Sequence, residues 1–109
     1  MSQSSPDLDS IVREFLDLTK REEDAQIFGL LFQYLGHLYE ESEDPILLED
    51  LSAYEIDDYL QFFLQDNFQE EFLELQRKSI LVLKNFRKFL SDKKLLEKED
   101  EKEWKEVLK

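Results

Sequence analysis

The side chains that could do chemistry in this chain are few. His37 is the only histidine, and there is no cysteine. Acidic residues occur in adjacent pairs, Glu40 with Glu41 and Asp57 with Asp58, and carboxylate pairs can serve as metal ligands or as a general acid and base. Adjacent residues on a helix diverge by about 100°, so neither pair converges on one point by spacing alone. A solvated acidic surface is the favoured interpretation of both pairs.

A catalytic role needs a nucleophile beside a base, and His37 has no ExxH or HExxH partner. The sequence contains no glycine-rich phosphate loop and no D-x-D-x-D-G calcium loop. Without cysteine there is no disulfide framework, no thiolate zinc site and no cysteine nucleophile. The helical spacing of the four tyrosines and nine phenylalanines predicts core residues rather than platforms for base stacking. We therefore expect a protein that is not an enzyme and that needs no cofactor or metal.

Charge is distributed unevenly along the sequence. The formal net charge is −13, but residues 1–76 hold 3 bases against 20 acids, whereas residues 77–109 hold 11 bases against 7 acids. The bases begin to gather in the stretch LQRKSILVLKNFRKFLSDKK, residues 75–94. An acidic surface steers a protein toward basic partners, and a basic stretch is the kind of surface that binds phosphate groups.

Length and composition predict one soluble, cytoplasmic domain over residues 1–109, with a core at about 6–96. Hydrophobic residues make up 41% of the 109 residues, which is enough to fold although 38% of the chain is charged. The longest apolar run without glycine is ILVL, residues 80–83, and a membrane span needs about 20 residues. The first residues, MSQSSPDLD, lack the basic flank and apolar core of a signal peptide.

Two glycines and two prolines leave few breakers, so the pattern predicts an all-α fold, a compact bundle of four to five helices. The start of a first helix is predicted by Ser5 as its cap, followed by Pro6 and by the acidic Asp7 in the first turn. A second helix is expected at about 22–41, either separate from the first or continuous with it as one bent helix. Gly29 and Gly36 lie on one face of it, which indicates close approach of a neighbouring helix or, as an alternative, room for a ligand.

The second half of the chain predicts three more helices. Ser52 and Glu55 form an S-x-x-E capping box at the start of a helix over 51–64. A long central fourth helix is expected at about 68–91, and a short C-terminal helix at about 99–108. One broad face of the fourth helix is apolar and predicts the centre of the core; it comprises Phe72, Leu75, Ser79, Val82, Leu83, Phe86, Phe89 and Leu90. The opposite arc is basic and comprises Arg77, Lys78, Lys84, Arg87 and Lys88, with Leu81 among them.

Four segments in this order carry a resemblance to a known family. They are IVREFL (11–16), FGLLFQYLGHLYEE (28–41), LEDLSAYEIDDYLQFFL (48–64) and LQRKSILVLKNFRKFLSDKKLL (75–96). In order and apolar spacing they resemble the N-terminal core-binding domain of tyrosine recombinases of the phage-integrase type. The resemblance spans about 85 residues and implies an orthogonal, SAM-like helical bundle.

That family's domain clamps DNA with its second and fourth helices. The resemblance therefore implies phosphate contacts from Arg77, Lys78, Lys84 and Lys88, with Arg87 on the same basic arc. Where that family's second helix would need basic side chains, this sequence has Gln26, Gln33 and His37. The family's catalytic domain has no counterpart in this sequence, so the resemblance implies no nucleophilic role for any of the tyrosines.

Two functions follow as expectations. In the first, the chain is a non-catalytic binding module that recognises a protein partner, basic or nucleic-acid-binding, through an acidic face. That face would comprise Glu40, Glu41, Glu43, Asp44, Asp57 and Asp58. In the second, the chain is an accessory module that binds DNA through its fourth helix and uses the basic arc.

Overall fold

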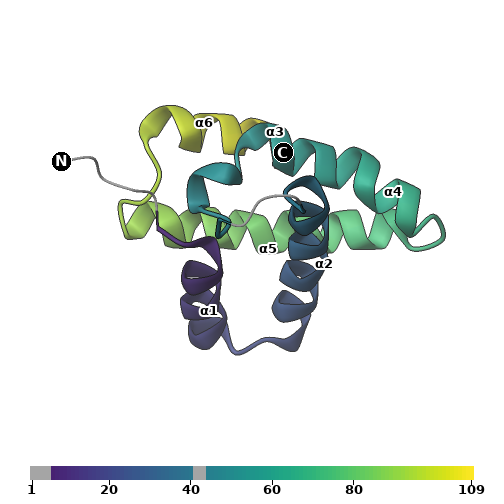
Figure 1. Ribbon diagram of the computed structural model, residues 1–109, viewed down its shortest axis with the longest axis horizontal. Coiled ribbons are helices and arrows are strands. Elements are labelled where there is room, and N and C mark those ends of the chain that lie inside the picture. The colour runs from purple at the N-terminus through teal and green to yellow at the C-terminus, as the bar shows by residue number, and fades with distance from the viewer. Residues whose placement is uncertain (1–5, 41–43) are drawn as a thin grey trace. The chain divides into compact units, whose positions relative to one another are not determined.

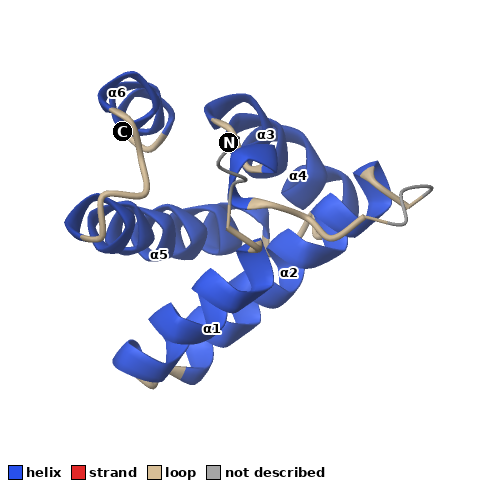
Figure 2. Cartoon of the chain, turned by 60° about the vertical axis from the view of Figure 1, so that its left-hand side comes forward, coloured by secondary structure: helices blue, strands red, loops and turns tan. Residues whose placement is uncertain are grey.

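A computed structural model describes residues 6–40 and 44–109. In this part of the chain every regular element is a helix, and the single β-type contact is an isolated bridge (Figures 1 and 2). The predicted all-α class, a bundle of four to five helices, is confirmed. The predicted long fourth helix corresponds to α5, Phe72–Asp92, which is the longest of the described helices. The chain divides into two units, residues 1–51 and residues 52–109, which are described separately. The SAM-like arrangement and the single domain over residues 1–109 stay predictions.

The first unit is built on a helical hairpin. Helix α1 spans Leu8–Thr19 and helix α2 spans Glu22–Leu38, so the two predicted helices are separate rather than one bent helix. Lys20 takes a left-handed backbone conformation with φ of 54°, and this ends α1 and turns the chain into α2. The two helices pack against each other. The rings of Phe15 and Phe28 meet edge to face, with their centroids 5.8 Å apart.

The start of α1 differs from the prediction. The N-cap is Asp7, whose Oδ2 accepts the backbone N–H of Ser10 at 3.1 Å, and not Ser5, which lies outside the described residues. The reason is a backbone pairing that holds Asp7 extended opposite Leu47. Leu8 N donates to Ile46 O at 2.9 Å, and Leu48 N donates to Pro6 O at 2.8 Å. The short 3₁₀ helix η1, Leu48–Asp50, follows this pairing.

The expected close approach of a neighbouring helix to the two glycines of α2 is wrong. A Cβ atom added to Gly29 or Gly36 would meet no atom within 4 Å among the described residues, so no neighbouring helix approaches either position closely. Both glycines are exposed and have ordinary helical backbone conformations. Glycine in a helix costs about 1 kcal/mol relative to alanine because its unfolded backbone is more free.

We predict that Gly29→Ala stabilises the protein by about 0.5–1 kcal/mol, since the methyl group meets open space and the unfolded chain loses freedom. The free energy of unfolding in denaturant measures the effect. A lower midpoint in the variant would show that something outside the described residues covers this face.

The second unit begins with a continuous helical segment of three parts. Helix α3 spans Ala53–Asp58, the π turn η2 spans Tyr59–Phe63, and helix α4 spans Leu64–Asn67. The predicted capping box is confirmed, because Ser52 N donates to Glu55 Oε1 at 3.0 Å and the two side chains also bond. The π turn has no signature in the sequence and was not predicted.

A buried polar contact accompanies the π turn. The Tyr59 hydroxyl lies 3.0 Å from Ser79 Oγ of the next long helix, and both residues are fully buried. Burial raises the pKa of Tyr59 to about 12, although the hydrogen bond with Ser79 acts in the opposite direction. Gln76 Nε2 donates to Leu60 O at 3.1 Å, within the π turn. Tyr59 is therefore a core residue, as predicted. Tyr54 is 74% exposed, so the prediction that it is a core residue is wrong.

Helix α5, Phe72–Asp92, is the long helix of this unit, and it contacts η2, α4 and the C-terminal helix α6, Lys98–Val107 (Figure 1). The predicted apolar face is confirmed at its centre, where Leu83 and Phe86 are fully buried. Trp104 of α6 is buried as well, and its ring centroid lies 6.3 Å from that of Phe86. The α6 helix also contacts α3, so the C-terminal segment is part of the packing of this unit.

We predict that Leu83→Ala and Phe86→Ala each lower the free energy of unfolding by about 2–5 kcal/mol, as truncations at fully buried positions do. Lys84→Ala is the matched control. Lys84 lies between Leu83 and Phe86 in the sequence but is exposed, so this change should alter stability by less than about 0.5 kcal/mol. Equal effects at all three positions would contradict the assignment of the buried face.

Candidate functional site

The exposed face of α5 mixes cations with leucines. Leu73 and Leu81 are 72% and 58% exposed, and Arg77, Lys84 and Lys88 are exposed beside them. At 100° per residue these five side chains fall within an arc of about 80°, and at 1.5 Å per residue they extend over about 22 Å. We call these five residues the α5 face. It exists because the apolar stripe of the same helix is buried and fixes the rotation of the helix about its axis.

The three cations of the α5 face are not neutralised within the described part of the chain. No described carboxylate lies within 4.0 Å of Arg77, Lys84 or Lys88. Their charges are therefore available to a partner. An exposed leucine flanked by such cations offers a contact that combines apolar burial with charge pairing.

Two residues of the predicted basic arc differ from this pattern. Arg87 does not lie on the exposed side as expected: its side chain is only 14% exposed, and its Nη1 lies 3.6 Å from Glu101 Oε2 of α6. The packing of α6 beside α5 covers it. Lys78 is half-buried and pairs with Glu74 one helical turn earlier at 3.5 Å. Neither residue therefore presents a free charge comparable to those of Arg77, Lys84 and Lys88.

A hollow of about 300 Å³ lies beside the C-terminal half of the α5 face. Five of the residues that line it are cations, namely Lys84, Arg87, Lys88, Lys105 and Lys109. Leu81, Asn85 and Leu108 complete the lining. A hollow of this size is at the lower limit for small-molecule sites and suits one or two side chains of a partner.

The sequence did not indicate Lys105 and Lys109 as part of this hollow, because only the packing of α6 against α5 brings them there. Lys105 lies in the last turn of α6, and Lys109 lies two residues beyond its end. Both form exposed pairs, with Glu101 at 3.6 Å and with Glu106 at 4.0 Å. Such pairs are weak and leave the lysines free to reorient toward a ligand.

Glu101 joins the two helices that form the hollow. Ser91 of α5 donates a hydrogen bond to Glu101 Oε2, and this bond lowers the pKa of the carboxyl below its ordinary value of 4.5. Lys105 and Arg87 lower the pKa further, while partial burial acts against them. A negative charge on Glu101 therefore stabilises the junction of α5 and α6.

We predict that Glu101→Gln lowers stability at neutral pH and that the difference from wild type shrinks as the pH falls below about 4.5. The pKa of Glu101 is lower in the folded state, so its contribution is present above the unfolded pKa and is lost as pH falls through the folded pKa. Denaturant unfolding at a series of pH values measures this. Glu103→Gln, also on α6 and exposed, is the control, and an equal, pH-independent effect of both variants would contradict the role of Glu101.

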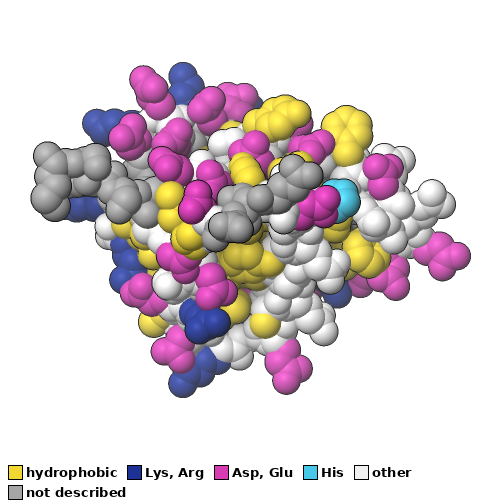
Figure 3. All heavy atoms as spheres, in the orientation of Figure 1, with side chains coloured by type: hydrophobic (Ala, Val, Ile, Leu, Met, Phe, Trp, Pro, Cys, Tyr) yellow, Lys and Arg dark blue, Asp and Glu magenta, His cyan; other side chains and the backbone are white. Residues whose placement is uncertain are grey.

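The residues of the predicted acidic face are not brought together within either unit. Glu40 and Asp44 belong to the first unit, whereas Asp57 and Asp58 lie in α3 of the second. Glu41 and Glu43 lie outside the described residues. Over α1 and α2, acidic side chains are interspersed with hydrophobic and uncharged ones (Figure 3). The acidic face therefore stays a prediction.

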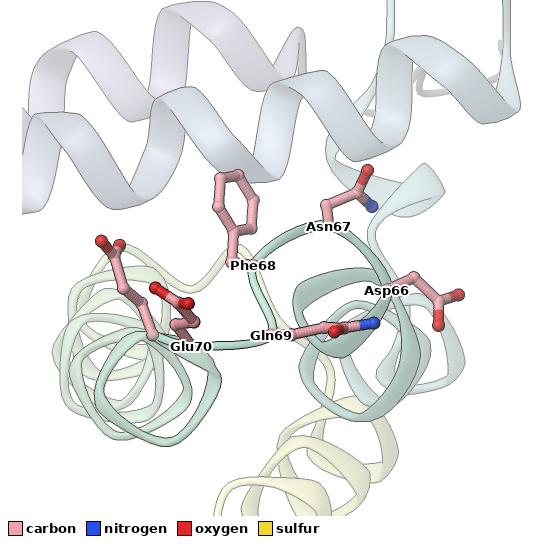
Figure 4. A pocket seen from close by; sticks show the side chains of 6 residues that line it. Asp66, Asn67, Phe68, Gln69 and Glu70 are labelled. Atoms are coloured by element: carbon pink, nitrogen blue, oxygen red, sulfur yellow. The ribbon is translucent and has the colours of Figure 1, made fainter.

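The other positions that could do chemistry do not form a site in the described part of the chain. His37 is exposed, with its Nδ1 3.9 Å from a carboxylate oxygen of Glu40. Among the described residues, no group of three acidic or histidine side chains could hold a metal ion. A second hollow follows the turn between α4 and α5 and is lined by the consecutive residues 66–71. Its side chains diverge, with Asp66, Phe68 and Glu70 pointing in different directions (Figure 4), so they do not converge on a ligand.

Comparisons with protein-family models, with curated proteins and with solved structures give no significant match. The likeness to the core-binding domain of tyrosine recombinases therefore stays a prediction from the sequence. None of the described helices is long and apolar enough to cross a membrane.

Proposed function

We propose that this chain is a non-catalytic binding module that recognises another protein through the α5 face. The observation that carries the proposal is the alternation of exposed leucines with unpaired cations on one side of a rigid helix. Leu73 and Leu81 lose contact with water only if a partner covers them, and a partner that does so also reaches Arg77, Lys84 and Lys88. Interfaces of proteins combine an apolar centre with a charged rim in this way.

No catalytic group is assigned, because the residue inventory offers one histidine and no cysteine. The absence of cysteine also suits a reducing compartment, and we place the protein in the cytoplasm on this ground. We also propose that a basic partner binds through the acidic residues. Residues 1–51 carry 13 acids and 3 bases, a charge of −10 that would steer such a partner toward them.

DNA is the second candidate ligand, favoured by the same three unpaired cations. Of the phosphate contacts that the family resemblance implies, Arg77, Lys84 and Lys88 are available, whereas Lys78 is paired with Glu74. One observation places DNA second. Leu73 and Leu81 are exposed beside these cations, and a phosphate backbone offers them no apolar contact, whereas a protein can cover them.

The test is affinity capture from cells that make the protein, using Lys84→Glu with Lys88→Glu as the loss variant. Lys98→Glu with Lys102→Glu, which changes two exposed lysines of α6, is the matched control. We predict proteins that are retained by wild type and by the control, are lost from the Lys84 and Lys88 variant, and are unaffected by nuclease. Retention that disappears on nuclease treatment would favour DNA, and retention that is equal for all three proteins would contradict a role for the α5 face.

A further inference from the structure

The α5 face differs in character between its two ends. Near the N-terminus of the helix, Leu73 is close in sequence to the exposed acidic residues Glu70, Glu71 and Glu74, of which Glu74 pairs with Lys78. Toward the C-terminus, Leu81 lies at the hollow lined by five cations. A partner that covers both leucines therefore meets several cations near Leu81, of which Lys84 and Lys88 have no described carboxylate within 4.0 Å.

The two leucines are eight residues apart on α5, which corresponds to about 12 Å along the helix axis. A second helix laid along α5 presents its own side chains at three- and four-residue intervals, and these intervals match the spacing of the α5 face. The whole face, from Leu73 to Lys88, is about 22 Å long and would be covered by about 15 helical residues.

We propose that the α5 face binds an amphipathic acidic helix of another protein. Apolar residues of that helix cover Leu73 and Leu81. Its carboxylates pair with Arg77, Lys84 and Lys88, and one acidic side chain enters the hollow between Lys88 and Lys105. This inference rests on the proposed function and specifies the chemistry of the partner.

Charge complementarity selects this occupant over the others. Arg77, Lys84 and Lys88 have no described carboxylate within 4.0 Å, so pairing with them displaces no internal ion pair. An acidic side chain in the hollow would compete with Glu101 only for Lys105, whose exposed pair is weak. A nucleic acid would satisfy the cations and leave the leucines in contact with phosphate. A basic helix would cover the leucines and place like charges beside Lys84 and Lys88, which is unfavourable.

The probe is a fluorescein-labelled synthetic peptide of about 18 residues, long enough to cover the face. Leucines alternate at every third and fourth position to form one stripe, and glutamates flank the stripe. A shuffled peptide has the same composition but leucines on all sides, and a polyglutamate of equal length tests charge alone. Fluorescence anisotropy with the 109-residue chain measures binding at low and at physiological salt.

We expect the striped peptide to bind wild type at least about tenfold more tightly than either control peptide, because only the stripe covers both leucines. Leu73→Gln with Leu81→Gln should weaken binding by about tenfold or more, and so should Lys84→Glu with Lys88→Glu. The matched controls are Leu18→Gln with Leu38→Gln, exposed leucines of the first unit, and Lys98→Glu with Lys102→Glu. Both controls should bind within about twofold of wild type.

Three results would overturn the inference. Equal binding of the striped and shuffled peptides would mean that charge alone is recognised. Binding of a labelled DNA duplex that depends on Lys84 and Lys88 but not on the leucines, without preference for the striped peptide, would identify a phosphate-binding face. Sedimentation equilibrium that shows self-association, abolished by the leucine variant, would identify a second copy of the chain as the occupant.

Failure of this inference is distinguishable from failure of the proposed function. If no peptide binds wild type while the cellular capture still depends on Lys84 and Lys88, the α5 face binds a protein of different chemistry. If that dependence is also absent, the α5 face has no role in recognition.

Discussion

Burial of the apolar stripe of α5 is the constraint on which the rest of the second unit depends. A helix has one rotational freedom about its axis, and the burial of Leu83 and Phe86 removes it. The same burial that holds α5 against its neighbours therefore decides which residues remain outside. Arg77, Lys84 and Lys88 are exposed because they lie between the buried positions at helical intervals, so core packing and surface chemistry are two consequences of one periodicity.

The helices could be predicted from the sequence because they depend on local patterns. The capping box of Ser52 and Glu55 involves residues three positions apart, and the buried stripe of α5 repeats within one turn. Asp7 replaces Ser5 as a cap for a reason that is not local, since the pairing with residues 46–48 fixes where α1 begins. The open space around Gly29 could not be predicted either. Helical periodicity shows which residues share a face of α2 but not whether another element packs against that face.

In the candidate site, too, local features could be predicted from the sequence and features that depend on tertiary packing could not. The exposed cations of α5 followed from the helical pattern alone. The hollow did not, because Lys105 reaches it only through the packing of α6, and the same packing half-buries Arg87, whose position on the basic arc suggested free exposure. The π turn at Tyr59–Phe63 was missed for a related reason: its wider winding accompanies contacts from Ser79 and Gln76, which lie in a different helix.

The pairing between residues 6–8 and 46–48 has a consequence for tolerance to sequence change. It joins positions about 40 residues apart, and its two hydrogen bonds run between backbone atoms only. These bonds therefore do not depend on side-chain identity, although Leu8 and Leu48 are also buried and must stay apolar. Proline at position 8 or 48 would remove a bond, because the amide hydrogens of these residues are the two donors.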